Sequence, residues 1–275
     1  MTTRMAGGAT ATPDEASTAD EPLLRLRGIS KRFGPVQALA DVALDVGTGE
    51  VVALVGDNGA GKSTLIKAIS GVEPADQGEI QFDGEPVRII APSDSATLGI
   101  AVVYQDLALC DNLDVAANMF LGREATRGPG VPLDEFSMEK RARELLESLA
   151  LRTLLSVRAE VGLLSGGQRQ TVAVARALLG KPRMVILDEP TAALGVAQTA
   201  QVLELVEHLR GRGLGVILIS HNLDDVFTVA DRIVVLRLGR NAGEFEAEDA
   251  HRQAVVAAIT GANGNGGSAQ PPLAK

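Results

Sequence analysis

Short apolar runs separated by glycine-rich or polar turns recur along this chain of 275 residues. Uniformly apolar runs are typical of strands buried on both faces of a parallel sheet, and alternating runs are typical of strands with one exposed face. The uniform pattern predicts buried strands at residues 51–55, 100–103, 184–188, 216–220 and 233–236. The alternating pattern predicts half-exposed antiparallel strands at residues 24–29 and 39–46.

A hairpin signal follows these two alternating strands. Asp83-Gly84 separates the apolar residues 80–82 from residues 87–90, and this dipeptide is typical of a tight turn between antiparallel strands. We therefore expect the hairpin to belong to the same layer as the strands at residues 24–29 and 39–46. That layer would lie at one edge of the parallel sheet.

Between Gln105 and Leu164 the strand pattern disappears. Residues 114–121 and 136–149 show helical spacing instead, on either side of Arg127-Gly128-Pro129-Gly130. Helical stretches also separate several of the parallel strands, as crossover connections require. The sequence therefore predicts an α/β fold with a parallel sheet, an antiparallel β layer and a helical insertion at about residues 106–165.

The two ends of the chain lack such periodicity. Residues 1–22 mix Thr, Ala, Gly and acidic residues, without the apolar core of a secretory signal, and we expect a disordered tail there. Residues 261–275 are rich in Gly, Asn, Ser and Pro and are predicted to be flexible. Residues 23–260 then form one domain.

Composition narrows the classes of function. The net charge of −9 and the pI of about 4.9 argue against a nucleic-acid partner, because such binding needs a basic face. The apolar runs are far shorter than the roughly 20 residues of a membrane-spanning helix. Cys110 is the only cysteine, which suits a reducing cytoplasm and a small side chain that is buried or half-buried.

The first chemical motif is a phosphate-binding loop, Gly56-Asp57-Asn58-Gly59-Ala60-Gly61-Lys62-Ser63-Thr64. It follows the strand at residues 51–55 and leads into a helix that ends at Gly71, so backbone N–H groups can point at phosphate oxygens. Lys62 would neutralise the β and γ phosphates, Ser63 would ligate Mg²⁺, and Thr64 would contact phosphate. A chance glycine pattern at a helix start is the alternative, and the strand and helix on either side disfavour it.

Polar residues follow two of the predicted buried strands. Asp188 and Glu189 end the strand at residues 184–188, where Asp188 can hold Mg²⁺ through water and Glu189 can accept a proton from the attacking water. His221 follows the strand at residues 216–220, at the sheet edge where open α/β folds bind ligands, and can contact the γ phosphate or that water. Solvated loop acids and a structural imidazole are the alternatives. His208 and His251 are predicted to lie on the surface.

One more segment, Leu164-Ser165-Gly166-Gly167-Gln168, lies between the phosphate-binding loop and Asp188. With these motifs in this order, residues 22–260 resemble the nucleotide-binding subunits of ABC transporters. The resemblance implies a RecA-like P-loop NTPase core with an antiparallel β subdomain and a helical subdomain that carries this segment, the family signature. It also implies a head-to-tail dimer, in which Ser165, Gly166, Gly167 and Gln168 of one copy cover the ATP bound by the other. An ordinary helix cap would explain Ser165 but not two consecutive glycines.

The same resemblance assigns further residues. Phe33, in a polar turn, resembles the aromatic side chain that stacks on adenine, although partial packing is an alternative. Gln105 resembles the glutamine that contacts Mg²⁺ or the attacking water and acts as a hinge toward the helical insertion. Residues 106–115 correspond to the region that contacts the membrane subunits. At one position the chain departs from the family, because Ala192-Ala193-Leu194 is followed by Gly195 instead of an aspartate.

Within the family, residues 56–59, 113–122 and 220–233 look most like bacterial monosaccharide importers of the ribose, xylose and fructose type. This implies a homodimeric ATPase, peripheral on the cytoplasmic face of the membrane, that uses Mg²⁺ and ATP to power a separate permease supplied by a sugar-binding protein. Two alternatives stay open. The chain could be a soluble ABC-type factor, although it lacks tandem nucleotide domains, or it could be a subunit of an exporter or a regulatory ATP-binding module.

Overall fold

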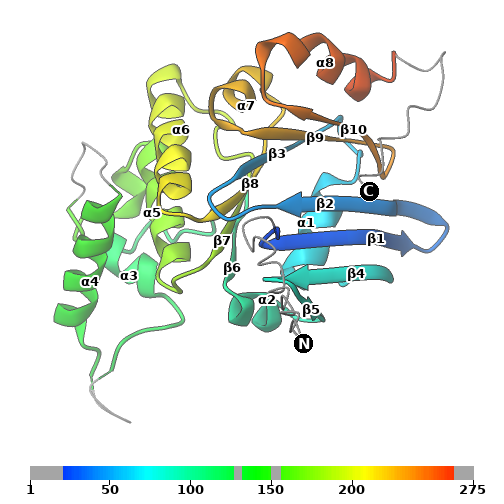
Figure 1. Cartoon of the computed structure of the whole chain (residues 1–275). Helices are drawn as coiled ribbons and strands as arrows, with labels where there is room; N and C mark the ends of the chain where they lie inside the picture. Colours follow the sequence, from blue (N-terminus) through cyan, green and yellow to red (C-terminus); the bar gives the residue numbers. More distant parts are fainter. Residues whose placement is uncertain (1–20, 127–131, 150–155, 263–275) are drawn as a thin grey trace, which may run out of the picture.

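The computed structural model describes residues 21–126, 132–149 and 156–262 as two sheets with helices around them (Figure 1). Residues 1–20, residues 263–275 and the predicted turn at residues 127–130 lie outside the described residues. Within the described part of the chain, none of the helices combines the length and the apolar character that crossing a membrane would require.

The central sheet has the strand order β10-β9-β3-β8-β7-β6. Its members are β3 (Val51–Val55), β6 (Ile100–Val103), β7 (Met184–Asp188), β8 (Gly215–Ile219), β9 (Arg232–Arg237) and β10 (Arg240–Glu246). All neighbours from β9 to β6 are parallel, and β10 pairs antiparallel with β9. The five predicted buried strands are confirmed, with shifts of at most one residue at their ends.

These strands are apolar throughout because both faces of the central sheet are covered. Along β8, Val216 and Leu218 pack in a core with the helices on one side, and Ile217 and Ile219 pack on the opposite side. That second core includes apolar residues of α1 (Lys62–Ser70) and of the antiparallel sheet. A strand covered on both faces carries no polar alternation, which explains why the uniform pattern was a reliable signal.

The antiparallel sheet has the order β2-β1-β4-β5, with β1 (Leu24–Phe33), β2 (Val36–Val46), β4 (Gln77–Phe82) and β5 (Glu85–Val87). The predicted turn at Asp83-Gly84 is confirmed, since both residues have positive φ, 58° and 77°. The predicted hairpin is confirmed, because β4 and β5 pair antiparallel with Ile80 opposite Val87, but its second strand ends at Val87 instead of continuing to residue 90. The N–H groups of Ile90 and Ala91 donate to the Asp94 carboxylate at the start of the next helix instead of to a neighbouring strand.

Most of the helices on one face of the central sheet gather on one side of the molecule, at the left in Figure 1. They are α3 (Val115–Phe120), α4 (Glu135–Ser148), α5 (Gly166–Leu178) and α6 (Val196–Gly211). The helical patterns at residues 114–121 and 136–149 are thus confirmed as α3 and α4. Asp114 caps α3 by accepting from the N–H of Ala117 at 2.7 Å.

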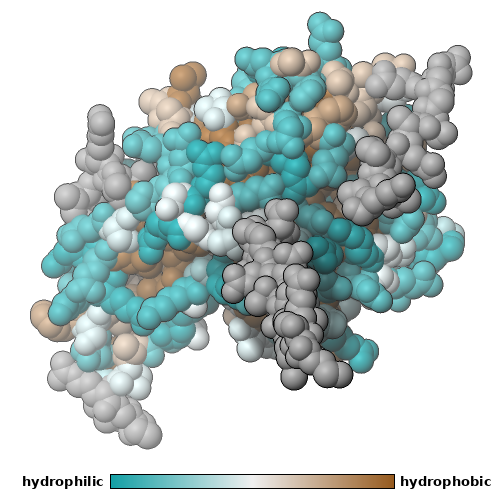
Figure 2. Space-filling view, viewed as in Figure 1, coloured by the Kyte–Doolittle hydropathy of each residue, from teal (hydrophilic) through white to brown (hydrophobic). Residues whose placement is uncertain are grey.

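Three short helices and one edge strand were not predicted. They are α2 (Pro92–Leu98), α7 (Leu223–Val229), α8 (Arg252–Thr260) and β10. Seven to nine residues carry too few apolar positions to establish a period, and such helices depend on tertiary packing. Val255 of α8, for example, is fully buried against β3 and β9. In the view of Figure 2 the surface is mostly hydrophilic, with brown areas near α8 and among the helices at the left.

Candidate active site

The loop between β3 and α1, residues 56–61, turns the chain sharply at the carboxyl edge of the central sheet. Gly56 has a φ of 148°, and a methyl group there would lie 2.2 Å from the carbonyl oxygen of Leu236. Gly61 has a φ of 106°, and its methyl group would lie 2.8 Å from Leu39 Cδ2. Both positions therefore require glycine because of packing within the chain itself. The first turn of α1 follows immediately, with its N–H groups directed toward the loop.

Lys62 folds back over this loop and is only 8% exposed. Its ammonium nitrogen donates to the carbonyl oxygens of Gly56 at 2.5 Å and Asp57 at 3.1 Å. Burial lowers the pKa of Lys62, while the nearby charges of Glu189 and Asp188 oppose that shift. An ammonium group has three N–H donors, so this cation can still contact an anion above the loop.

Asp188 and Glu189 stand at the end of β7, as the sequence predicts. Burial raises the pKa of the half-buried Asp188 carboxyl, Glu189 raises it further, and Lys62 acts in the opposite direction. Glu189 has a φ of 49°, and its N–H donates to the carbonyl of Ile219 at 2.9 Å, which ties it to the neighbouring strand β8. The backbone conformation of Glu189 is thus held by the sheet itself.

His221, just beyond β8, approaches Glu189 from that neighbouring strand. Its Nδ1 lies 3.4 Å from Glu189 Oε2, and its side chain is 68% exposed whereas that of Glu189 is 21% exposed. The imidazole is therefore not a buried structural group, and it can orient the carboxylate while it faces an incoming ligand. The structure brings these two predicted residues together.

A cavity of about 400 Å³ joins the loop to these carboxylates, and we call it the nucleotide cavity. Among the predicted site residues, it is lined by Asn58, Gly59, Ala60, Gly61, Lys62, Ser63, Thr64, Gln105, Asp188 and Glu189. Gln105 reaches it from the segment that follows β6. The cavity thus gathers residues from the ends of three strands, which finish at Val55, Val103 and Asp188 and are therefore 48 and 85 positions apart along the chain. Figure 1 shows the ends of β3, β7 and β6 in the same sheet.

Several lining residues of the nucleotide cavity were not predicted: Val36, Gln37, Ala38, Ile219, Leu238 and Gly239. Val36 and Leu238 are 61% and 74% exposed, so they offer an apolar rim at the mouth of the cavity. Leu238-Gly239 follows β9, whose carboxyl end meets the same sheet edge as β3. The position of Leu238-Gly239 after a buried strand could have indicated that these residues line the cavity. That inference requires the strand order, because only the pairing of β9 with β3 places the end of β9 beside the loop.

Phe33, at the end of β1, does not line the cavity among the described residues. Its ring is 43% exposed, and Lys31 Nζ lies 5.7 Å from the ring centroid. The ring is therefore not core filling, because it remains open to solvent on one side. Its assignment as the residue that stacks on a base stays a prediction.

The signature segment, residues 164–168, lies at the start of α5 and is not part of the nucleotide cavity of its own chain. Ser165 Oγ accepts from the N–H of Gln168, and Gln168 Oε1 accepts from the N–H of Ser165 at 2.9 Å, which is a reciprocal capping box. Ser165 and Gln168 therefore have a structural role, and the two glycines between them lie in the first turn of α5, where backbone N–H groups have no acceptor within the helix.

The donor set of the nucleotide cavity suits a magnesium ion bound together with phosphate. The Ser63 hydroxyl, the Gln105 amide oxygen and the Asp188 carboxylate are hard oxygen ligands that line one cavity. Among the described residues, no group of three or more His, Cys, Asp or Glu side chains is placed to bind a metal ion by itself. This agrees with the usual arrangement in nucleotide sites, where one or two protein ligands bind Mg²⁺ and the phosphates supply the rest.

The remaining histidines differ from their prediction as surface residues. Both are only half exposed, and His208 Nε2 is buried with no hydrogen-bond partner among the described residues. His251 Nδ1 lies 3.0 Å from the carbonyl oxygen of Glu246, and its ring packs against Phe245. The spacing of apolar residues in the sequence does not distinguish a position that neighbouring elements partly cover, such as His208 or His251, from one that is fully exposed. Cys110 is half-buried, as expected.

Comparison with known families identifies a match to the ABC transporter model over residues 39–192. This range includes the phosphate-binding loop, Gln105, the signature segment and the carboxylates at the end of β7. His221 and β8 to β10 lie beyond it. The matched range covers more than half of the chain and contains most of the motifs, so it establishes the family.

Curated relatives and solved structures agree with that match. The chain is 49% identical over 250 residues to the fructose import ATP-binding protein FrcA of Rhizobium meliloti, which covers 89% of this chain and 96% of that protein. It is 44% identical to the xylose/arabinose import ATP-binding protein XylG of Sulfolobus acidocaldarius, over 86% of this chain and 94% of the relative.

Among solved structures, a nucleotide-free ATP-binding cassette from an ABC transporter superposes with a TM-score of 0.76 at 29% identity, covering 86% of this chain and 95% of the other. A dimeric cassette in a post-hydrolysis state, bound to ADP and Pi, superposes with a TM-score of 0.67 at 27% identity, covering 82% and 99%. The fold, the ordered motifs and these relatives lead to one assignment: the chain belongs to the ABC transporter family and is one of its ATP-binding, ATP-hydrolysing cassettes.

Proposed function

We propose that this cassette couples hydrolysis of Mg-ATP to the import of a sugar through a separate permease. The observation that carries the proposal is the nucleotide cavity, where the cation of Lys62, the Ser63 hydroxyl, Gln105 and the two carboxylates converge. The named sugar import functions of the relatives at 49% and 44% identity support the direction and class of transport. A sugar-binding protein and the permease would choose the sugar.

The residues of the cavity divide the work of hydrolysis between them. Lys62 and the N–H groups of the first turn of α1 bind the β and γ phosphates and hold them in line with the attacking water. Glu189 accepts the proton of that water, and His221 at 3.4 Å orients the Glu189 carboxylate. A magnesium ion held by Ser63, Gln105 and Asp188 would neutralise charge on the phosphate oxygens.

The signature segment completes this site from a second copy of the chain, as in a head-to-tail dimer. In support, the segment does not line the nucleotide cavity of its own chain. Leu163, just before the segment, is 81% exposed, and Val196, at the start of the adjacent helix α6, is 91% exposed. The dimeric cassette structure described above supports the same assembly.

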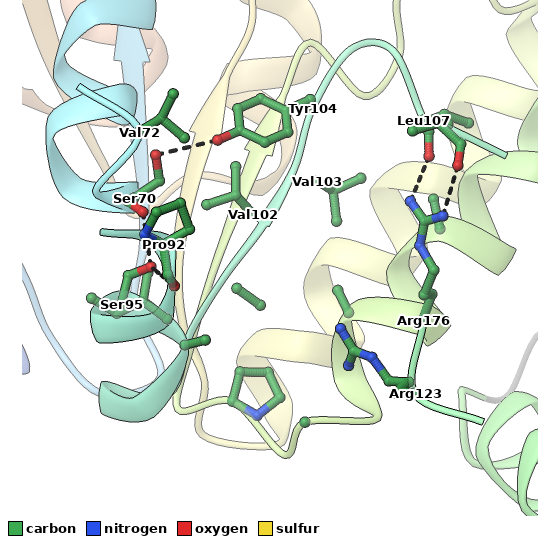
Figure 3. Close-up of a pocket in the computed structure, with 18 of the residues that line it drawn as sticks. Ser70, Val72, Pro92, Ser95, Val102, Val103, Tyr104, Leu107, Arg123 and Arg176 are labelled. Atoms are coloured by element: carbon green, nitrogen blue, oxygen red, sulfur yellow. Dashed lines mark hydrogen bonds between the residues drawn. The ribbon is translucent and has the colours of Figure 1, made fainter. Parts of the chain in front are cut away.

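A second cavity of about 510 Å³, the lateral groove, is proposed as the docking site of the permease (Figure 3). Val72, Tyr104 and Leu121 line it with apolar surface and are 48%, 38% and 46% exposed. Arg123 and Arg176 line the same groove and supply positive charge. The groove also includes residues 106–108, which belong to the segment that the family resemblance assigns to the membrane subunits. Gln105 lies between this groove and the nucleotide cavity.

Contacts along this segment connect the lateral groove to the signature helix. Arg176 of α5 donates to the carbonyl oxygens of Leu107 at 2.6 Å and Ala108 at 2.8 Å, as Figure 3 shows. Burial lowers the pKa of the Arg176 guanidinium, and nearby Arg123 adds to this effect. Arg169, about two turns before Arg176 on α5, pairs with Asp111 of the same segment. A permease segment that moves residues 106–111 would therefore pull on α5, which carries the signature at its start.

The location proposed for this chain is the cytoplasmic face of the membrane, to which the permease would hold it. Its acidic charge supports a protein partner over nucleic acid. The test is affinity capture of the tagged chain from detergent-solubilised membranes of its host, compared with an Arg176→Met variant and an Arg212→Met control outside the groove. We expect an integral membrane permease to be captured by wild type and control and to be depleted with Arg176→Met. Recovery of ribosomes or nucleic acid instead would overturn the proposal.

A further inference from the structure

A further cavity, which we call the basal cavity, lies at the opposite edge of the central sheet from the nucleotide cavity and has a volume of about 480 Å³. It is lined by α4, by the end of α5 and by the turns that lead into β7 and β8. The carboxylates of the nucleotide cavity stand at the other end of β7, and the two cavities have no described lining residue in common. A ligand in the basal cavity would therefore occupy a site separate from that of ATP.

Three cations line the basal cavity from three different elements. Arg141 belongs to α4, Lys181 to the turn after α5, and Arg212 to the turn between α6 and β8. Glu144, whose carboxylate lies 3.9 Å from the Lys140 ammonium, is the one acidic residue among the described lining residues. The basal cavity therefore has an excess of two positive charges, although the chain as a whole has a net charge of −9.

Within the part of the chain that the structure describes, these three cations form no ion pair with a carboxylate. Cations only two positions away along the chain behave differently. Arg183 pairs with Asp83 at 2.6 Å, and Arg210 pairs with Asp231 at 2.9 Å. The fold thus neutralises these neighbours internally and leaves the cations of the basal cavity available to an anion from outside.

Two of the three cations are held in position by uncharged acceptors. Arg141 donates to the carbonyl oxygen of Leu179 at 3.0 Å, and Arg212 donates to Ser148 Oγ at 3.3 Å. A guanidinium has five N–H donors, so each arginine is oriented by one bond and keeps other donors for a ligand. Less side-chain freedom is lost on binding when the arginines are already oriented.

The basal cavity also has an apolar lining. Leu178, Leu179 and Leu214 are 6%, 7% and 8% exposed, and the half-buried Leu145 of α4 lines the same cavity. An inorganic anion would contact the cations and leave these leucines uncovered. A volume of about 480 Å³ with a mixed lining of this kind is typical of sites for small organic molecules.

We propose that the basal cavity binds a phosphate monoester whose alcohol part is apolar. At neutral pH a phosphate monoester carries nearly two negative charges, which matches the excess of positive charge in the cavity. Its oxygens accept from the two guanidinium groups and the lysine, and its apolar part covers the leucines. The bound ester links α4 to the turns that precede β7 and β8. A free ester and the headgroup of an anionic lipid share this chemistry.

The first test is calorimetric titration of the full chain with phenyl phosphate, with Mg-ADP present to fill the nucleotide cavity. We expect a Kd of about 1 mM or lower, at least about fivefold below that of inorganic phosphate, because the ring adds apolar contact. Lys181→Met and Arg212→Met should each raise this Kd about tenfold, since each removes one charge-assisted hydrogen bond.

Arg143→Met, at an exposed position of α4 that does not line the basal cavity, is the matched control and should stay within about twofold of the wild-type Kd. Equal Kd values in wild type, Lys181→Met and Arg212→Met would overturn the proposal. So would a wild-type chain that binds phenyl phosphate no more tightly than inorganic phosphate, or that does not bind it at all.

The apolar lining is tested separately with Leu145→Ala. This variant is expected to raise the Kd of phenyl phosphate about fivefold and to leave that of inorganic phosphate within about twofold of wild type. Differential scanning fluorimetry checks that the variant is folded, and Leu145→Val replaces it if it is not. Equal weakening of both probes would show that apolar contact plays no part in binding, contrary to the proposal.

Cosedimentation with phosphatidylcholine vesicles that contain about 20% phosphatidic acid separates the two sources of phosphate. Vesicle binding that Lys181→Met abolishes, and with which phenyl phosphate competes, assigns the site to a lipid headgroup. A wild-type chain that stays in solution while it binds phenyl phosphate assigns the site to a free ester. Vesicle binding that Lys181→Met leaves intact also assigns it to a free ester, because the vesicles then contact another surface.

This inference does not depend on the proposed function. Arg212→Met, the control in the permease capture, should still recover the permease while it loses affinity for phenyl phosphate. Loss of both would place Arg212 in the docking surface and would contradict a separate site. A wild-type chain that binds phenyl phosphate but captures no permease would overturn only the proposed function.

Discussion

The nucleotide cavity and the signature segment are the two regions that meet in the proposed dimer, and they are built in different ways. The cavity is formed by backbone: the ends of strands β3, β6 and β7 set its walls, and Gly56 and Gly61 allow the loop to approach its neighbours. The signature segment is held by side chains, through the Ser165 and Gln168 cap and the contacts of Leu194 and Gln198. The first region is therefore preorganised by the sheet, and the second depends on a few replaceable contacts.

This difference predicts which property a substitution in each region should change. Changes of cavity side chains remove chemistry from a backbone that remains in place, so they should alter binding or turnover with little effect on folding. Changes in the signature segment alter a helix start and its packing, so they should alter stability and association together.

Glu189→Gln is expected to reduce ATP turnover by roughly 10²–10⁴-fold, because it removes the group that accepts the proton of the attacking water. Nucleotide affinity should remain close to that of wild type, and a closed dimer should accumulate with ATP, as measured by light scattering. Glu79→Gln, at an exposed position of β4, is the matched control. Undiminished turnover in Glu189→Gln would show that another group is the base. The side chains of the cavity would then not supply the chemistry that distinguishes it from the signature segment.

Lys62→Ala is expected to weaken ATP binding by roughly 10–100-fold, since one charge-assisted hydrogen bond is worth about 1.5–3 kcal/mol. Isothermal titration calorimetry of the single chain measures this affinity. Lys67→Ala on the same helix, whose ammonium pairs with Glu73 away from the cavity, should bind ATP like wild type. Equal losses in both variants would mean that α1 as a whole, and not the loop lysine, determines the affinity.

Ser165→Ala is expected to lower the free energy of unfolding by about 1 kcal/mol through loss of the helix cap, and to reduce ATP-dependent association at the same time. Denaturant titration and light scattering measure the two effects. Ser93→Ala, at an exposed serine of α2, serves as the control. If Ser165→Ala impaired association without any change in stability, substitutions in the signature segment would affect function alone, as they do in the nucleotide cavity. The two regions would then not differ in the way proposed.

Asp188→Asn is expected to raise Tm slightly at neutral pH while it lowers activity. Burial and Glu189 raise the pKa of Asp188 in the folded chain above its unfolded value, so folding favours the protonated form. The stability that comes from this preference is present below the unfolded pKa and is lost as pH rises through the raised pKa. The gain in Tm should therefore shrink when the pH is lowered through that window, as differential scanning fluorimetry can show.

Asp249→Asn provides the control for this pH series, because Asp249 is exposed beside Arg252 and away from the cavity. Its Tm should differ little from wild type at either end of the series. A Tm for Asp188→Asn that stays below wild type at all pH values would show that the carboxylate stabilises the free chain, contrary to the direction in which its pKa is shifted.

Predictions from sequence succeeded where a local pattern has a single structural meaning. The uniform runs identified all five parallel strands, and Asp83-Gly84 identified its turn, because double-sided burial and positive φ each restrict the residues that can occur. They were wrong about the extent of the second hairpin strand, which ends at Val87, because the Asp94 carboxylate accepts from the N–H groups of Ile90 and Ala91. They also failed for short helices such as α7, which tertiary packing stabilises.

The chain by itself determined the order of the motifs and the chemical identity of the side chains at each strand end, since these are properties of local pattern and residue type. Only the tertiary structure decided which strand ends are neighbours, and therefore that Leu238 and Val36 form the rim of the cavity and that Leu194 fills the space beside Gly166. The physical reason is that such contacts join residues far apart in the chain, whose distance is set by sheet order and helix packing and leaves no periodic trace in the sequence.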